Sequence, residues 1–357
     1  MTMSKLEESE ALHARARAFV AAFGRGEPMP EAFDALARDL ADFQARWNAG
    51  YARLRAARGE AIPAVPTEVF KLARVSVFDE GETPVVFRTS GTTAAARGAH
   101  WFRTCATYDA ASVAMGRVAL GVSERVPVLV LGPPPAEQPD SSLVHMMARF
   151  VEAFGTAASV DETYFVRDGV MDLVALDERV TRLLMSSVRD TVVLATSLAY
   201  VHLLDALGGA KFRMPDRTRA MQTGGFKTLT RSVDGSALRR DVARAFCIDE
   251  SAVVSEYGMT ELSSQFWETS FVGGERNVWV EPPWARVVPV DPETLAPVAN
   301  GATGIARIED LANVDSAVAI VTADQVRRAG RGFELLGRSA GAPPRGCSIA
   351  TEEMLGP

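Results

Sequence analysis

The sequence predicts an α/β protein in which a mainly parallel β-sheet is covered by helices on both faces, followed by a smaller β-rich subdomain. Short apolar segments alternate with helix-like segments between residues 85 and 255, as buried parallel strands and their crossovers do. Beyond Trp267 the sequence changes to short β-like segments rich in Pro and Gly. With 357 residues, 47% of them hydrophobic, the chain can bury a large core.

A helical region opens the chain. Between residues 7 and 58, Ala, Arg and Glu predominate and large apolar residues recur at helical spacing. Pro63 and Pro66 end this pattern, so residues 1–62 are assigned to a helical N-terminal region in which no chemistry is visible.

The α/β core is predicted over residues 63–267 and begins with a strand at residues 85–87. Further strands are expected at residues 128–131, 191–196, 219–222 and 252–255. Helices are expected at residues 108–120, 141–154, 177–188 and 236–246. Asp140 or Ser141 can cap the second of these helices.

The β-rich subdomain is predicted over residues 268–329, and residues 330–357 form a C-terminal tail that carries Cys347. The expected strands of the subdomain are residues 278–284, 286–290, 304–308 and 317–322. The tail is rich in Gly, Pro and Arg and is too short for a domain of its own.

Composition and charge argue against several classes of function. The formal net charge of −7 indicates no basic surface for nucleic acid or anionic lipid. The polar N-terminus lacks the apolar core of a signal peptide, and no membrane span of about eighteen apolar residues is predicted. The three cysteines are too scattered for a disulfide framework or a Cys-x-x-Cys metal site. We therefore expect a cytoplasmic protein whose partners are small molecules or another protein.

A loop of small and hydroxyl residues follows the strand at residues 85–87. Residues 90–98 read Ser-Gly-Thr-Thr-Ala-Ala-Ala-Arg-Gly. Small residues let backbone N–H groups and hydroxyls converge on phosphate oxygens, and the cation of Arg97 can offset phosphate charge. The phosphate-binding candidates are Ser90, Gly91, Thr92 and Thr93. Taken alone, an ordinary Ser/Thr/Gly turn is an equally good interpretation.

A second polar segment follows the strand predicted at residues 252–255, where open α/β sheets bind ligands. Tyr257 can stack on a base, Thr260 can bond a phosphate, and Glu261 can hold Mg²⁺ through oxygen ligation. The candidate residues of this segment are Glu256, Tyr257, Gly258, Thr260 and Glu261. The alternative interpretation is a helix N-terminus capped by Thr260.

Two more segments carry candidate residues. After the strand at residues 219–222, Gly224 and Gly225 permit close backbone approach to a flat ligand, and Lys227 is the only lysine that the sequence places near these loops. Asp324 is expected just after a strand, where a carboxylate can accept both hydroxyls of a ribose. A simple turn and an exposed loop aspartate would look the same.

Together and in this order, these segments resemble the motifs of the adenylate-forming superfamily, which comprises acyl-CoA synthetases, peptide-synthetase adenylation domains and luciferases. Its phosphate loop, Ser-Gly-Thr-Thr-Gly-x-Pro-Lys-Gly, is matched by residues 90–98 with arginine in place of the lysine and alanines in place of Gly and Pro. Its Tyr-Gly-x-Thr-Glu motif is matched fully by residues 257–261. Its Thr-Gly-Asp and Gly-Arg elements are similar to residues 322–324 and 337–338.

Within that superfamily the chain resembles the acyl-protein synthetases, the fatty-acid-activating component of bacterial bioluminescence operons. The likeness extends from about Val85 to the C-terminus. It is carried by residues 97–100 (Arg-Gly-Ala-His), 222–227 (Gln-Thr-Gly-Gly-Phe-Lys), 256–265 and 345–347 (Arg-Gly-Cys).

The resemblance implies an α/β domain of the adenylate-forming type with a truncated C-terminal domain, and a reaction that uses ATP and Mg²⁺. A carboxylic acid, expected to be a fatty acid, is activated as its acyl adenylate. A thiol then takes the acyl group. Arg97, Lys227 and Mg²⁺ on Glu261 would offset phosphate charge. Asp324 and Arg338 would join the nucleotide site, to which His100 is a further candidate, and His145 and Gly224 would line the acid pocket.

The resemblance also implies that Cys347 accepts the acyl group as a thioester and passes it to an acyl reductase or carrier protein. A glycine-flanked tail would make this thiol mobile, and Arg345 could lower its pKa. Cys105 and Cys247 lie in helical, apolar sequence and are expected to be buried.

Two alternatives stay open. Cys347 can be a passive cysteine, with the acyl adenylate delivered directly to an amine or to CoA. Because Ala94, Ala96 and Ala323 depart from the motifs, the other alternative is a relative that binds nucleotide or a partner protein without catalysis. The sequence leaves the chain length of the acid and the oligomeric state undetermined.

Overall fold

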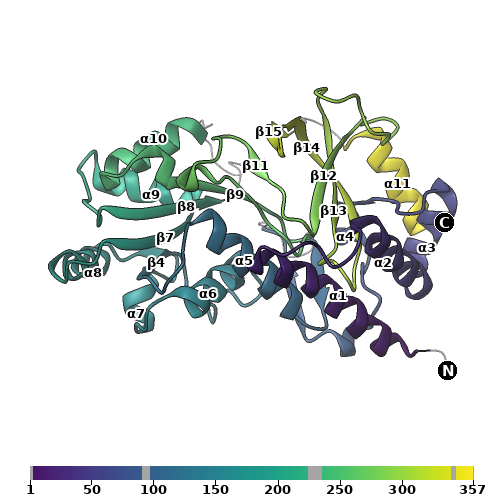
Figure 1. Cartoon of the computed structure of the whole chain (residues 1–357), viewed down its shortest axis with the longest axis horizontal. Helices are drawn as coiled ribbons and strands as arrows, with labels where there is room; N and C mark the ends of the chain where they lie inside the picture. The colour runs from purple at the N-terminus through teal and green to yellow at the C-terminus, as the bar shows by residue number, and fades with distance from the viewer. Residues whose placement is uncertain (1–2, 91–96, 224–234, 339–342, 357) are drawn as a thin grey trace. The chain divides into compact units, whose positions relative to one another are not determined.

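The computed structural model describes residues 3–90, 97–223, 235–338 and 343–356 and divides the chain into two compact units (Figure 1). Unit 1 comprises Met1–Ala114, Met259–Phe266 and Asn277–Pro357. Unit 2 comprises Met115–Gly258 and Trp267–Arg276. Unit 1 therefore combines both ends of the chain, and unit 2 holds most of the segment predicted as the α/β core.

Helices form in the N-terminal part of the chain, where the sequence predicts helical structure. They are α1 (Lys5–Arg25), α2 (Phe33–Trp47) and α3 (Ala49–Arg58). A reciprocal capping box between Ser4 and Glu7 starts α1 by satisfying backbone N–H groups that a helix terminus leaves unpaired. In α2, Leu36, Leu40 and Phe43 fall on one helical face and are fully buried, so apolar periodicity decides which face packs inward.

Unit 1 contains an antiparallel sheet in the order β12-β13-β14-β15-β11. These strands are β11 (Trp279–Val280), β12 (Ala285–Val290), β13 (Gly304–Asp310), β14 (Ala319–Ala329) and β15 (Gly332–Arg338). The short strand β1 (Val65–Pro66) pairs with β14 in parallel. Pro289 is tolerated in β12 because this strand stands at the end of the order, where a missing N–H disrupts little.

The rest of unit 1 consists of short elements and one C-terminal helix. The short elements are α4 (Val69–Leu72), the 3₁₀ helix η1 (Glu80–Glu82), and the hairpin strands β2 (Val85–Arg88) and β3 (Ala99–Phe102). Helix α5 (Ala106–Ala119) begins here. Helix α11 (Arg345–Leu355), yellow in Figure 1, packs against α3 and β1.

Unit 2 is built on a parallel sheet in the order β9-β8-β7-β4. These strands are β4 (Val128–Leu131), β7 (Asp190–Thr196), β8 (Arg217–Thr223) and β9 (Val253–Tyr257). The helices are α6 (Ser142–Phe154), α7 (Val160–Thr163), α8 (Leu173–Met185), α9 (Ser197–Leu207) and α10 (Gly235–Phe246). Short elements are β5 (Val166–Arg167), β6 (Val170–Met171), η3 (Glu250–Ala252), β10 (Phe266–Trp267) and η4 (Ser270–Val272).

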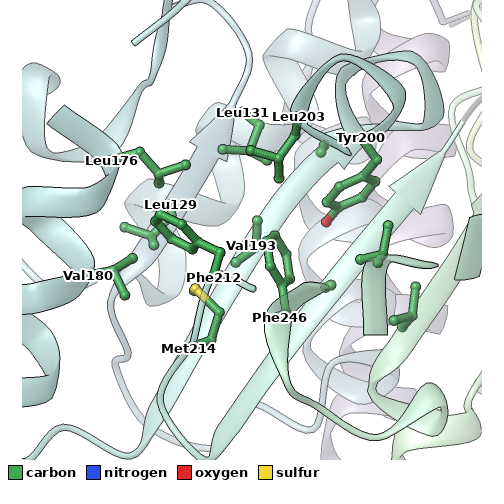
Figure 2. Packing of buried hydrophobic residues seen from close by; sticks show 14 of the residues in the cluster. Leu129, Leu131, Leu176, Val180, Val193, Tyr200, Leu203, Phe212, Met214 and Phe246 are labelled. Atoms are coloured by element: carbon green, nitrogen blue, oxygen red, sulfur yellow. The ribbon is translucent and has the colours of Figure 1, made fainter. Parts of the chain in front are cut away.

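The core of unit 2 confirms the predicted sheet with helices on its faces. Figure 2 shows Leu129 and Val193 from neighbouring strands packed with Val180 of α8, Leu203 of α9 and Phe246 of α10. Residues on both faces of β4 and β7 are buried, as expected for parallel strands covered on two sides. Helix α9 was not predicted from the sequence, and the predicted helix at residues 177–188 begins earlier, as α8.

Candidate functional site

The hairpin of β2 and β3 holds the first candidate loop at its base. The Thr89 backbone N–H donates to the Gly98 carbonyl at 2.9 Å, and the Gly98 N–H donates to Thr89 Oγ1 at 2.8 Å. Arg97 Nε donates to the Thr89 carbonyl at 2.7 Å. Ser90 is exposed at the same end of the hairpin. Gly91, Thr92 and Thr93, with Ala94 and Ala96, lie outside the described residues.

Lys71 is distant from this loop in the sequence but lies beside its base in the structure. Lys71 Cγ is 3.4 Å from the position that a Cβ on Gly98 would occupy. The Lys71 ammonium pairs with Glu68 at 2.8 Å. The expectation that Lys227 is the only lysine near these loops is therefore wrong, because α4 brings Lys71 to β3 through tertiary packing.

Residues 259–262 form a tight turn in unit 1. The Leu262 N–H donates to the Met259 carbonyl at 3.1 Å, so Thr260 and Glu261 are the two central residues. No helix begins at Thr260, which removes the alternative interpretation of Thr260 as a helix cap.

Two buried side chains contact the carbonyls of this turn. His100 Nδ1 lies 2.8 Å from the Thr260 carbonyl oxygen, and Asn313 Nδ2 donates to the Glu261 carbonyl at 2.9 Å. His100 Nε2 lies 2.8 Å from Ser316 Oγ. Burial lowers the pKa of His100 to about 4, so its ring is neutral near pH 7. Because a carbonyl oxygen only accepts, the proton resides on Nδ1 and the Ser316 hydroxyl donates to Nε2.

A carboxyl group holds the residues that follow the turn. Asp310 accepts from the Ser263 N–H at 3.0 Å, from Ser264 Oγ at 2.7 Å and from the Ala312 N–H at 2.9 Å. Burial raises the pKa of Asp310 to about 6, against the effect of these hydrogen bonds. The turn is thus fixed by side chains from β3, from the end of β13 and from the segment between β13 and β14.

Two late candidates lie opposite each other on paired strands of unit 1. Asp324 of β14 is registered against Arg338 of β15, with Oδ1 and the guanidinium 3.9 Å apart. The Asp324 N–H donates to Thr322 Oγ1 at 2.9 Å. Asp324 was expected after a strand, but β14 continues beyond it to Ala329 through an irregularity in pairing. The longer strand is what brings these two residues together.

In unit 2 the carboxyl ends of β8 and β9 bring Thr223 and Glu256 side by side. Thr223 is registered against Glu256, and its hydroxyl donates to Glu256 Oε2. Burial raises the pKa of Glu256 to about 7, and the Thr223 hydrogen bond opposes that shift. Tyr257 ends β9 and Gly258 follows it.

Three candidates in the loop after β8 lie outside the described residues, namely Gly224, Gly225 and Lys227. Beside β9, Arg239 Nη2 donates to Glu268 Oε2 at 2.5 Å and to Ser255 Oγ at 2.9 Å. This buried ion pair fixes the strand that ends in Glu256 and Tyr257, since Glu268 also accepts from the Ser255 N–H.

His145 lies half-buried in the first turn of α6, and its N–H donates to the carbonyl of Ser141, the N-cap of that helix. A surface pocket of about 270 Å³ lies between α9 and α10 and is lined by Leu204, Lys211 and Arg244. Neither His145 nor any other described candidate lines that pocket.

The environment of Cys347 differs from the expected mobile tail. Cys347 lies in the first turn of α11 with only 5% of its surface exposed. Burial raises the pKa of its thiol to about 11, against the opposing charge of Arg58. The Arg345 side chain instead points toward Glu293, 3.9 Å away, and is mostly exposed. The sequence of residues 345–355 predicted a tail rather than a helix. The reason is that this helix is stabilised by residues distant in the chain, which local sequence does not reveal.

The other cysteines also differ from expectation. Cys247 is exposed and Cys105 is partly exposed. Cys247 follows α10 with a backbone φ of 55°, in the left-handed region that ends a helix. The apolar residues that precede Cys247 in the sequence belong to α10, whereas Cys247 itself lies past the last helical turn.

The fit of Mg²⁺ depends on the nucleotide. Among the described residues no group of three His, Cys, Asp or Glu side chains could hold a metal ion. Glu261 offers one carboxylate of low exposure, and Mg²⁺ is commonly bound by one or two carboxylates together with substrate phosphates and water. The residues therefore fit Mg²⁺ only as a partner of bound phosphate.

Over the described ranges, none of the helices combines the length and hydrophobicity needed to cross a membrane.

A family model described as acyl-protein synthetase, LuxE, matches residues 56–356. No curated protein matches the chain.

Several solved structures are similar to the chain. An open conformation of 2-hydroxyisobutyryl-CoA ligase with 2-HIB-AMP and CoA has a TM-score of 0.60 at 14% identity, covering 84% of this chain and 73% of the ligase. The same ligase in the postadenylation state with 2-HIB-AMP has a TM-score of 0.61 at 12% identity, covering 94% and 69%. ATP-bound MatB from Rhodopseudomonas palustris has a TM-score of 0.50 at 18% identity, covering 73% and 49%. The chain thus spans about half the length of MatB, and these likenesses confirm the α/β fold class of the adenylate-forming ligases.

Proposed function

Because the chain belongs to the acyl-protein synthetase LuxE family, we propose that it activates a carboxylic acid with ATP as an acyl adenylate and transfers the acyl group to a thiol. The family match over residues 56–356 carries this proposal, since every candidate motif falls within it. A fatty acid is the proposed substrate class, and an acyl reductase or carrier protein the proposed final acceptor.

The first step joins the acid to the nucleotide. A carboxylate oxygen attacks the α-phosphorus of ATP, the bond from that phosphorus to the bridging oxygen breaks, and pyrophosphate leaves. Charge develops on phosphate oxygens, so fixed cations and backbone dipoles stabilise the transition state. Arg97, whose guanidinium is anchored at the base of its loop, and Lys227 would supply the cations. Mg²⁺ held by Glu261 and the phosphates would neutralise further charge.

The remaining candidates would bind the nucleotide and the acid. Ser90, Gly91, Thr92, Thr93 and Thr260 would contact phosphates, and Asp324 beside Arg338 would accept from the ribose hydroxyls. The other proposed nucleotide contacts are Glu256, Tyr257, Gly258, Gly224 and Gly225, with His145 and Gly224 facing the acid.

In the second step Cys347 Sγ attacks the acyl carbonyl carbon, the bond to the adenylate oxygen breaks, and AMP leaves. Only a thiolate is an effective nucleophile. With a pKa of about 11, only about one Cys347 thiol in ten thousand is ionised at pH 7. Acylation therefore requires α11 to open or the thiol to ionise only as it reacts. That burial favours a second candidate, in which the acyl adenylate is delivered directly to an amine or to CoA.

Exchange of labelled pyrophosphate into ATP tests the first step. We expect exchange that depends on an added carboxylic acid, in a panel that varies chain length and ring character. Acid-dependent exchange excludes a relative that binds nucleotide without catalysis. Its absence across the panel would leave that non-catalytic alternative in place of our proposal.

Mass spectrometry after incubation with ATP and acid separates the two acceptor models. Cys347→Ala should lose the acyl adduct and keep pyrophosphate exchange, whereas Cys247→Ala should keep both. Because Cys247 is an exposed thiol, the second variant controls for non-specific acylation. Full product formation by Cys347→Ala with an amine or CoA would support direct transfer instead.

A further inference from the structure

We propose that His100 and Asn313 are positioning residues that fix the Thr260–Glu261 turn by hydrogen-bonding its two central carbonyls. The inference rests on the proposed function, in which Thr260 and Glu261 contact the triphosphate and its metal ion. It assigns a role to Asn313, which belongs to none of the candidate motifs, and to His100, which follows the phosphate loop.

The turn is held from two directions. The Thr260 carbonyl accepts from His100 on β3, and the Glu261 carbonyl accepts from Asn313 between β13 and β14. A peptide plane can rotate in a turn that only its own Met259–Leu262 hydrogen bond closes. Fixing both central carbonyls removes that freedom, so the Thr260 and Glu261 side chains leave the backbone in fixed directions.

Both positioning residues are themselves held in place. His100 and Asn313 each expose only 1% of their surface. Ser316 orients the His100 ring through Nε2, and the Asn313 amide also donates to the Ala317 carbonyl at 3.1 Å. Phe70 and Phe102 contact the His100 ring, with ring centroids 5.6 and 4.1 Å away. Residues locked by packing and by further hydrogen bonds hold the groups that they contact more accurately than exposed ones do.

His100 also links two candidate segments. It lies on β3 next to the phosphate loop, close in the chain to Arg97, whose guanidinium bonds the Thr89 carbonyl. A shift of β3 would therefore displace the Thr260 carbonyl as well. Misplacement of reacting groups by about 1 Å can cost about 100-fold in rate, so this link affects catalysis more than binding.

Substitutions that distinguish the hydrogen bonds of the two His100 ring nitrogens test the positioning role. His100→Leu removes both hydrogen bonds. His100→Asn keeps a donor at the position of Nδ1 and loses the bond to Ser316, and Asn313→Ala removes the second carbonyl contact. Leu54→Ala is the matched control, because Leu54 is fully buried in α3 and its loss reduces stability without touching the turn.

Pyrophosphate exchange is measured below the unfolding temperature of every variant. We expect His100→Leu to lower kcat by about 100-fold with a smaller change in KM for ATP, and His100→Asn to recover at least about tenfold of that loss. Leu54→Ala should keep kcat within about threefold, since it retains every bond to the turn. A folded His100→Leu with near-normal kcat, or His100→Asn no better than His100→Leu, overturns the proposal.

Hydrogen exchange of residues 259–264, followed by mass spectrometry, needs no catalysis. His100→Leu and Asn313→Ala should lose protection there, and Leu54→Ala should keep it relative to its global stability. The wild-type protein can lack acid-dependent pyrophosphate exchange while these variants lose hydrogen-exchange protection at residues 259–264. In that case the proposed function fails and the positioning role stands. Unchanged protection in both variants overturns the positioning role.

Discussion

Burial decides the protonation of carboxyl groups beside the candidate motifs. Burial raises the pKa of Glu256 from its ordinary 4.5 to about 7 and that of Asp310 to about 6. Each accepts hydrogen bonds, which favour the ionised form, yet desolvation outweighs them. Two groups near the motifs therefore change charge close to neutral pH, where most carboxyl groups in proteins do not.

Glu256→Gln should remove a pH dependence of stability. Between pH 4.5 and about 7 the folded protein keeps the Glu256 proton that the unfolded chain has lost, so wild-type stability falls as pH rises through this window and is flat above it. Gln keeps an oxygen that can accept from Thr223. We expect the variant to match wild type below pH 4.5 and to exceed it by up to about 3 kcal/mol at pH 8.

Denaturant unfolding at a series of pH values measures this difference, in which the titration of Asp310 cancels. Thr223→Val is the companion variant, since losing the hydroxyl that opposes the shift should move the window upward. A stability difference between wild type and Glu256→Gln that is constant with pH contradicts the assignment.

At the same scale the sequence revealed the motif residues but not those that hold them. The Tyr-Gly-Met-Thr-Glu segment has a recognisable pattern. His100 was only a minor candidate, and Asn313 and Asp310 had no signal, because each is defined by a partner far away in the chain. Burial of Cys347 and exposure of Cys247 were likewise missed, since both depend on which residues pack against α10 and α11.

At the scale of elements, apolar runs predicted the strands of unit 2, and short β-like segments between Pro and Gly residues predicted most strands of unit 1. Two of the missed elements, strand β15 and helix α11, lie in the Gly- and Arg-rich C-terminal sequence. Each is stabilised by a partner rather than by its own pattern. Tertiary packing thus overrides weak local propensity at the C-terminal end of the described chain.

Gly346→Ala should undock the start of α11. A Cβ at Gly346 would lie 2.8 Å from Leu295 Cγ and 2.9 Å from the Pro292 carbonyl oxygen, to which the Gly346 N–H donates. Overpacking of this kind costs about 1–3 kcal/mol. Denaturant unfolding should show that loss, and the rate of Cys347 labelling by a thiol reagent should rise because the helix covers the thiol.

Gly24→Ala is the control for this substitution. Gly24 lies in α1 with open space around the added methyl group, so the change should be neutral or stabilising by up to about 1 kcal/mol. If Gly346→Ala behaves like Gly24→Ala in both measurements, close packing at Gly346 does not hold α11.

At the scale of the whole molecule, residues from both ends of the chain meet within unit 1. The family match starts at residue 56, after α1, α2 and most of α3, yet α1 and α2 contact the segment that follows β13. Ser9 Oγ and His13 Nε2 bond Asp315, at 2.6 and 3.0 Å. The N-terminal helices were predicted correctly as helices, but their support of the candidate site could not be read from local sequence.

Gln44 of α2 offers the sharpest test of that support. Its amide nitrogen donates to the Asn313 and Val314 carbonyls at 2.8 and 2.9 Å, and its Oε1 accepts from the Val318 N–H at 2.9 Å. Gln44→Leu keeps the side-chain volume but leaves three buried backbone groups unpaired, each at a cost of about 1–3 kcal/mol before relaxation. We expect a loss of at least about 2 kcal/mol in unfolding free energy, together with lower hydrogen-exchange protection over residues 310–317 and 259–264.

Gln138→Leu, on an exposed loop, is the control and should change neither the unfolding free energy nor this protection. Since Gln44 holds the Asn313 backbone and the Asn313 side chain holds the turn, a variant that loses stability but keeps protection at residues 259–264 would confine the role of the N-terminal helices to folding.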